Sequence, residues 1–124
     1  MALDAISTPT IVEEIPHNGK TLWSINGIDT DASTAIEIKA APGTGKSLYI
    51  TEIFIGSDDA DAHPMIQDED ANVLFGPLQS TTGGIHLVAV LRHPIKMVSN
   101  KALQIKAEAA GNVFVFVEGA TADD

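Results

Sequence analysis

Residues 40–56 read AAPGTGKSLYITEIFIG, and this stretch decides the fold. Its second part, residues 46–56, is a long run of β-branched and aromatic residues, and both of its faces are largely apolar. That pattern is typical of a central strand that is covered on both sides. The first part spells the end of a nucleotide-binding loop, so the stretch predicts either a phosphate site or a turn that leads into a strand.

A phosphate-binding loop has the pattern G-x-x-x-x-G-K-[ST], and the helix that follows it directs its N-terminus at the phosphates. Residues 45–47 match the end of this pattern, but Ala40 stands where the first glycine belongs, and a strand pattern follows instead of a helix. Pro42 and Gly43 fit the second and third positions of a type II turn, and Gly45 fits a bulge. We therefore expect a turn here and no nucleotide.

Outward from this stretch, apolar and polar residues alternate with the period of two that β-strands have. Turn signals such as Asn26-Gly27 interrupt the alternation. Many short strands between such turns predict an all-β fold, an antiparallel β-sandwich of the jelly-roll kind with about eight strands. The candidate strands are TLWSI (21–25), TAIEIKA (34–40), KSLYITEIFIG (46–56), HPMIQD (63–68), NVLFG (72–76), IHLVAVL (85–91), PIKMV (94–98), ALQIKAEA (102–109) and NVFVFVEG (112–119).

The best candidate for a helix is KALQIKAEAAG, residues 101–111, in which Gly111 could end the helix. In the same segment Leu103 and Ile105 alternate strictly with polar residues. Because strict alternation is the spacing of a strand, and a strand pattern also follows, we favour a strand.

The chain divides into three parts on this reading. Residues 1–20 carry two prolines and little periodicity, and only TPTIVEEI (8–15) could pair as a short edge strand. This part is predicted to be an N-terminal arm, and both an arm ordered by a neighbouring molecule and a flexible terminus remain open. Residues 21–119 form the sandwich domain, and residues 120–124 form an acidic C-terminal tail.

The composition and charge of the chain exclude several classes of function. The chain has 124 residues, which suits one domain, and no cysteine, which excludes disulfides and thiolate chemistry. Its 17 acidic and 7 basic residues give a net charge of −10, which repels nucleic-acid backbones and anionic membranes. The start of the chain is not a signal peptide, and no apolar run approaches the roughly 20 residues of a membrane helix. We expect a soluble product made in the cytoplasm, with neither nucleic acid nor membrane as partner.

Patterns for catalysis or metal binding are weak. Acidic loops could hold calcium, but none has the spacing of an EF-hand, and solvated carboxylates are the favoured interpretation. The histidines form no H-x-H pair, which a metal-binding cupin needs. A single Trp23 and a single Tyr49 offer little for stacking sugars. We expect no catalytic residue, no cofactor, no metal and no enzymatic activity. The residues weighed are Asp29, Asp31, Asp58, Asp59, Asp61, Asp68, Glu69, Asp70, His17, His63, His86 and His93.

The final strand pattern, VFVFV at residues 113–117, is apolar on both faces. Its valines can fill a sandwich, while Phe114 and Phe116 then need a cover on the other face. A loop or sheet of the same chain and a neighbouring subunit are both possible covers.

The order of segments from Ala41 to Gly119 resembles that of a family of small tailed-phage proteins that decorate or cement the head. The matching segments are the glycine-rich turn and long strand APGTGKSLYITEIFIGS, the middle strand VLFGPL, and the final run GGIHLVAVLRHPIKMVSNKALQIKAEAAGNVFVFVEG. The span from Ala41 to Gly119 covers about two-thirds of the chain, and the first twenty residues have no counterpart.

The resemblance implies a structural role rather than catalysis. It implies a homotrimer that is made in the host cytoplasm, binds the major capsid protein and sits on the capsid surface of the virion. The alternative is a fibre or tail knob that recognises a host receptor or glycan, and an enzyme of the cupin or P-loop kind ranks third. Candidate contacts with the capsid or with another subunit are Thr8, Pro9, Thr10, Ile11, Val12, Ile15, Phe114 and Phe116.

Overall fold

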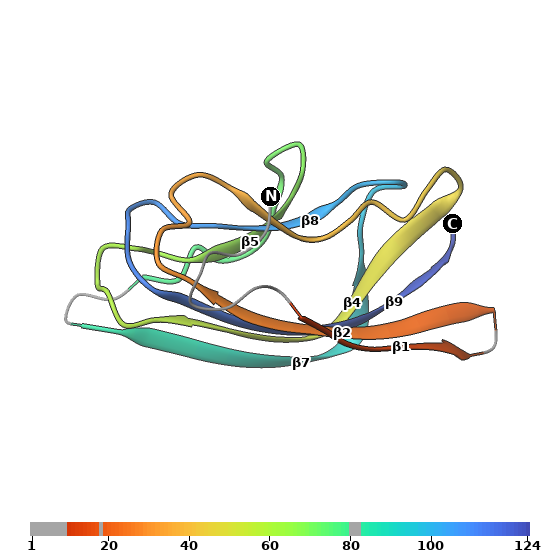
Figure 1. Ribbon diagram of the computed structural model, residues 1–124, viewed down its shortest axis with the longest axis horizontal. Helices are drawn as coiled ribbons and strands as arrows, with labels where there is room; N and C mark the ends of the chain where they lie inside the picture. The colour runs from red at the N-terminus through yellow and green to blue at the C-terminus, as the bar shows by residue number, and fades with distance from the viewer. Residues whose placement is uncertain (1–9, 18, 80–82) are drawn as a thin grey trace.

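The computed structural model describes residues 19–79 and 83–124, together with the backbone of residues 10–17. These residues form nine strands in two antiparallel sheets, and none of them is helical. The two sheets lie one above the other as the layers of a sandwich (Figure 1). The predicted all-β antiparallel sandwich is confirmed. In the described part of the chain there is no helix that could cross a membrane.

The strands are divided between a sheet of five and a sheet of four. The five-stranded sheet contains, in spatial order, β1 (Thr10–His17), β2 (Lys20–Asp29), β9 (Val113–Asp123), β4 (Lys46–Ser57) and β7 (Ile85–Lys96). The four-stranded sheet contains, in spatial order, β3 (Ile36–Lys39), β8 (Leu103–Lys106), β5 (Met65–Asp68) and β6 (Val73–Phe75).

The pairings are nested along the chain. Strand β2 pairs with β9, β3 with β8, β4 with β7 and β5 with β6, all antiparallel. This is the order that results when one long hairpin is rolled into two facing sheets, which is the topology of a jelly roll. Strand β1 adds one further strand beside β2.

The core between the sheets is aliphatic, as expected for a chain with few aromatic residues. Val113, Val115 and Val117 of β9 are buried on the inner side, while Phe114 and Phe116 lie on the outer side and are half-buried. Complete burial of one such aliphatic side chain contributes about 1.5–3 kcal/mol. The fully buried large residues are Ile25, Leu48, Ile50, Ile53, Ile55, Ile66, Met97, Leu103, Ile105, Val113 and Val117.

A bulge explains why β4 has apolar residues in both phases of the alternation. The register with β9 shifts between Ile50 and Glu52, so Thr51 is an extra residue opposite that strand. One extra residue reverses the side to which later side chains point. Ile50 and Ile53 are therefore both fully buried although they are three residues apart. Strand β4 is central in its sheet as predicted, but its aliphatic residues all serve one face.

The GKS stretch is a turn, as predicted. The Lys46 amide donates a hydrogen bond to the Gly43 carbonyl at 3.2 Å, and strand β4 begins at Lys46 itself. Gly43 and Gly45 have φ values of 109° and 83°, which favour glycine. The hydrogen-bonded turn spans residues 43–46, so it lies two residues later than the turn expected around Pro42 and Gly43.

Several boundaries differ from the expected ones. Strand β1 places residues 10–17 of the predicted arm in the sheet, and residues 1–9 lie outside the described part. Strand β9 continues through Asp123, so most of the predicted acidic tail is strand. The turn expected at Asn26-Gly27 is absent, because these residues pair with Phe116 and Val115 inside β2.

Candidate interaction surface

The acidic loops use their carboxylates to hold their own backbone. Asp68 is only 1% exposed and accepts hydrogen bonds from the Asp70 amide at 2.9 Å and from the Asn72 amide and side chain, each at 3.0 Å. Burial alone would raise the pKa of Asp68, but the hydrogen bonds outweigh it and the pKa lies below the ordinary value of 3.8. Asp68 therefore remains ionised as the anchor of its turn.

Neighbouring acids in this loop reach across to the segment before β8. The Ala102 amide donates to Glu69 Oε1 at 2.8 Å, and Lys101 Nζ lies 2.9 Å from Asp70 Oδ2. Hydrogen bonding to Asp70 raises the pKa of Lys101, because it favours the charged ammonium. These contacts join two loops rather than form a cage for an ion.

Three other acidic residues that were weighed as calcium ligands also accept hydrogen bonds within the loops. Asp31 accepts hydrogen bonds from Ser33, Asp59 accepts one from the Asp61 amide, and Asp58 accepts one from Asn112. Within residues 19–79 and 83–124, no three histidine, aspartate or glutamate side chains gather in a way that could hold a metal ion.

Two of the histidines make specific side-chain contacts. His63 Nδ1 pairs with Glu108 Oε1 and links the loop before β5 to the loop after β8. The ring of His86 stacks on Phe54, with centroids 6.1 Å apart and an interplanar angle of 20°. Gly56 makes this stack possible, because a side chain at that position would meet the Cβ atom of His86 at 2.7 Å.

The outer face of the five-stranded sheet carries an apolar surface. In one row across the strands, Phe54 of β4 lies between Phe116 of β9 and Val88 of β7. In the next row, Phe114 lies between Ile28 of β2 and Gly56 of β4. We call this surface the outer apolar face, defined by Phe54, Val88, Val90, Phe114 and Phe116.

The outer apolar face is most exposed where it reaches β7. Val88 is 55% exposed and Val90 is 76% exposed. A hollow on the same face, near the start of β7, is lined by Phe54, Ile85, His86 and Phe114, among others. The four-stranded sheet cannot cover this surface, because it packs on the opposite side of β9 against Val113, Val115 and Val117. Exposed apolar patches of this kind on a folded domain commonly mark contact sites.

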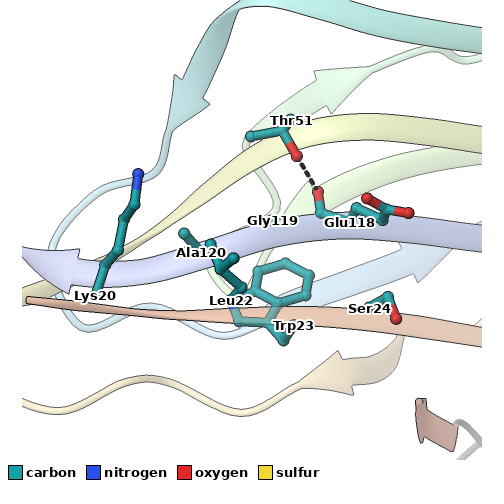
Figure 2. A pocket seen from close by; sticks show the side chains of 8 residues that line it. All are labelled: Lys20, Leu22, Trp23, Ser24, Thr51, Glu118, Gly119 and Ala120. Atoms are coloured by element: carbon teal, nitrogen blue, oxygen red, sulfur yellow. Dashed lines mark hydrogen bonds between the residues drawn. The ribbon is translucent and has the colours of Figure 1, made fainter. Parts of the chain in front are cut away.

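A second hollow lies over β2, β9 and β4 (Figure 2). At the floor of this hollow, Gly119 lies close to Trp23 and Tyr49. A Cβ atom on Gly119 would come within 2.7 Å of the Trp23 ring and 2.2 Å of the Tyr49 carbonyl oxygen. The Trp23 side chain is buried, and its indole nitrogen has no hydrogen-bond partner among the described residues. The Thr51 hydroxyl donates to the Glu118 carbonyl at 3.2 Å, which closes one side of the hollow.

The predicted contact residues are distributed over two strands of one sheet. Thr10, Ile11 and Ile15 lie on β1, opposite Asn26, Ile25 and Leu22 of β2, and Val12 lies at a bulge. Thr8 and Pro9 lie outside the described residues. Phe114 and Phe116 lie on the outer apolar face, so the prediction that they turn away from the core holds, while their role in contacts stays a prediction.

The sequence interpretation did not single out Phe54, Val88 or Val90. Along β4 and β7 each of these residues alternates with inward-facing residues, which indicates that it points outward. That the three lie on one surface can be recognised only when the register between the strands is known. Comparison of the chain with models of known protein families, with curated proteins and with solved structures finds no match.

Proposed function

We propose that the chain is a structural protein of a tailed-phage virion, which binds the major capsid protein on the outside of the shell as a homotrimer and stabilises the capsid. The observation that carries this proposal is the outer apolar face with the exposed Val88 and Val90 at its margin. An apolar surface that extends over β9, β4 and β7 suits a large protein partner better than a small molecule, which prefers an enclosed pocket. The segment order, which resembles that of head-decoration proteins, supports the major capsid protein as this partner.

The proposal requires only modest affinity at each contact. A trimer presents three copies of the outer apolar face to a lattice of repeated capsid subunits. Once one copy is bound, the others bind at a high local concentration, so the overall affinity exceeds that of a single contact by orders of magnitude. The acidic surface keeps the unbound protein soluble and disfavours binding to released DNA.

The test uses expanded tailed-phage shells that lack a decoration protein. The purified full chain is mixed with the shells, and bound protein is measured by co-sedimentation and located by electron microscopy. Val90→Glu should weaken binding by about tenfold or more, because the new carboxylate would have to be desolvated in the interface. The matched control is Val73→Glu, since Val73 is also exposed, at 47%, but lies on β6 in the other sheet.

Both variants are expected to fold, because the two valines are exposed. Equal binding of the Val90→Glu and Val73→Glu proteins would contradict the proposed contact face. Binding of the wild-type chain to host cells or their glycans, without binding to shells, would favour the alternative of a fibre or tail knob.

A further inference from the structure

The two edges of the five-stranded sheet differ sharply from the other two edges of the sandwich. Strands β3 and β6, which border the four-stranded sheet, have four and three residues. Strands β1 and β7, which border the five-stranded sheet, have eight and twelve. Within residues 10–17, 19–79 and 83–124, no strand pairs with the outer side of β1 or of β7. Among the described residues, the outer backbone groups of both strands therefore have no strand partner.

The first part of β7, residues 85–91, lacks the features that usually protect an edge, whereas the second part carries Arg92, Pro94 and Lys96 and a shift of register against β4 between Val90 and Ile95. Natural proteins place charges, prolines or bulges on exposed edges to prevent pairing with other chains. Residues 85–91 contain neither an acidic nor a basic residue nor a proline, if histidine is counted as neutral. Their apolar side chains are exposed on both faces, since Leu87 is 44% and Val88 is 55% exposed. Such an edge is suited to pair with a strand of another molecule.

The distribution of charge along the chain indicates which strand of another molecule would pair with β7. Residues 71–107 contain no aspartate or glutamate, so all 17 acidic residues of the chain lie outside this segment. The segment holds four of the seven basic residues, and two of them, Arg92 and Lys96, lie on β7. The edge formed by β7 is therefore cationic on a molecule whose net charge is −10.

The opposite edge has the opposite charge. Strand β1 reads TIVEEIPH, with Glu13 and Glu14 and no lysine or arginine. Pairing of β7 with β7 of a second copy would give its cations no acidic partner, and pairing of β1 with β1 would bring carboxylates together. Pairing of β7 with β1 brings opposite charges together, which favours association and fixes the partner edge.

We propose that β7 of one copy pairs with β1 of the next copy, so that the five-stranded sheets of neighbouring copies join head to tail. Neighbouring strands in the sheet are antiparallel, so β1 and β7, the first and the fifth, run in the same direction. Copies related by rotation about an axis along the strands keep that direction, and the new pairing is parallel. A contact between two different surfaces closes into a ring when the rotation closes.

This contact also extends the outer apolar face, because Val88 and Val90 on β7 would adjoin the sheet of the next copy. A ring of three would agree with the proposed homotrimer. The inference does not rest on capsid binding, since it concerns the isolated chain in solution.

Charge-swapped variants of the full chain test the pairing. The mass of each protein is measured by light scattering at micromolar concentration and at low and moderate salt. The wild type is expected to be oligomeric and to dissociate as salt rises. The double variant Arg92→Glu/Lys96→Glu and the double variant Glu13→Lys/Glu14→Lys should each raise the dissociation constant by about tenfold or more. The variant with all four substitutions should form the oligomer again, because its edges are once more complementary.

The control is Lys20→Glu/Lys46→Glu, which alters net charge as much as the β7 variant but replaces exposed lysines of β2 and β4. It should remain oligomeric. A monomeric wild type would refute the pairing, as would four substitutions that fail to restore the oligomer. Loss of the oligomer in the β7 variant but not in the β1 variant would indicate β7–β7 dimers and would also refute it. Capsid binding is not a readout, so failure here bears on the homotrimer but leaves binding to the shell to its own test.

Discussion

The hydroxyl of Thr51 donates a hydrogen bond to the carbonyl of Glu118 on β9, at 3.2 Å, from the extra residue of the β4 bulge. The bulge directs both Ile50 and Ile53 into the core. The Thr51 hydrogen bond therefore holds β4 at the residue where the alternation of inward and outward side chains is reversed. Two predictions on stability separate the hydrogen bond from the bulge itself.

Thr51→Val keeps the shape of the side chain and removes the donor, so it should lower the free energy of unfolding by about 1 kcal/mol. Deletion of Thr51 removes the extra residue, which would turn Ile53 and Ile55 away from the core or force a shift of register. The deletion variant should fail to fold cooperatively. Urea titration followed by Trp23 fluorescence measures both effects, and a stable deletion variant would contradict the role of the bulge.

Gly119→Ala should destabilise the fold by more than its backbone conformation alone would require. The added methyl group would collide with the Tyr49 carbonyl and the Trp23 ring, and neither the backbone nor the buried ring can move freely. We expect a loss of about 2 kcal/mol or more. Gly43→Ala is the comparison, because Gly43 has a φ of 109° but no atom within 4 Å, and it should cost about 1 kcal/mol. Equal losses would show that the collision is relieved.

Asp68 should make stability depend on pH in the acidic range. Its folded-state pKa lies below the ordinary 3.8, so its ionised form stabilises the fold above that value, and this contribution disappears as the pH falls through the lowered pKa. Asp68→Asn should lower the free energy of unfolding at pH 7 by about 1–3 kcal/mol. Between about pH 5 and pH 2 its stability should fall less steeply than that of the wild type. Parallel curves from urea unfolding at each pH would argue against this role of Asp68.

Substitution of a buried residue and of an exposed residue of the five-stranded sheet should change the free energy of unfolding by different amounts. Ile53→Ala removes a fully buried side chain and should cost roughly 2–5 kcal/mol. Val90→Thr changes a side chain that is 76% exposed, and its effect should stay within about 0.5 kcal/mol. Thermal unfolding of the two variants checks this, and a large loss for Val90→Thr would mean that the outer apolar face is covered in solution.

Chelation should not affect the folded chain. The carboxylates of Asp31, Asp59 and Asp68 already accept hydrogen bonds from nearby backbone amides, so the loops hold their shape without an ion. The melting temperature should be the same with EDTA and with added calcium. A shift of several degrees in opposite directions would show that an acidic loop binds calcium.

Most of the fold could be predicted from the sequence, because alternation and turn residues are local signals. Residues 102–109 were expected to be strand despite their helical composition, and β8 forms there. The failure at Asn26-Gly27 has a tertiary cause. A local preference for a turn is worth less than two rows of backbone pairing, and the residues of β2 pair with β9 through this point.

The candidate surface was less predictable, for a related reason. Phe114 and Phe116 were recognised, because one strand contains the whole pattern VFVFV. Phe54, Val88 and Val90 were not, because their grouping depends on the register between β4, β7 and β9, which no local pattern contains. The bulge at Thr51 also conceals which residues of β4 share a side.

The nested pairing has a consequence for how the molecule is made. Strand β9 follows the other eight strands along the chain, yet it lies between β2 and β4, in the middle of its layer. While the ribosome is still making β9, β2 and β4 have no partner between them, and their apolar sides remain open to other nascent chains. The five-stranded sheet therefore cannot be completed before β9 has emerged, and protection by a chaperone until then would increase the yield of folded protein.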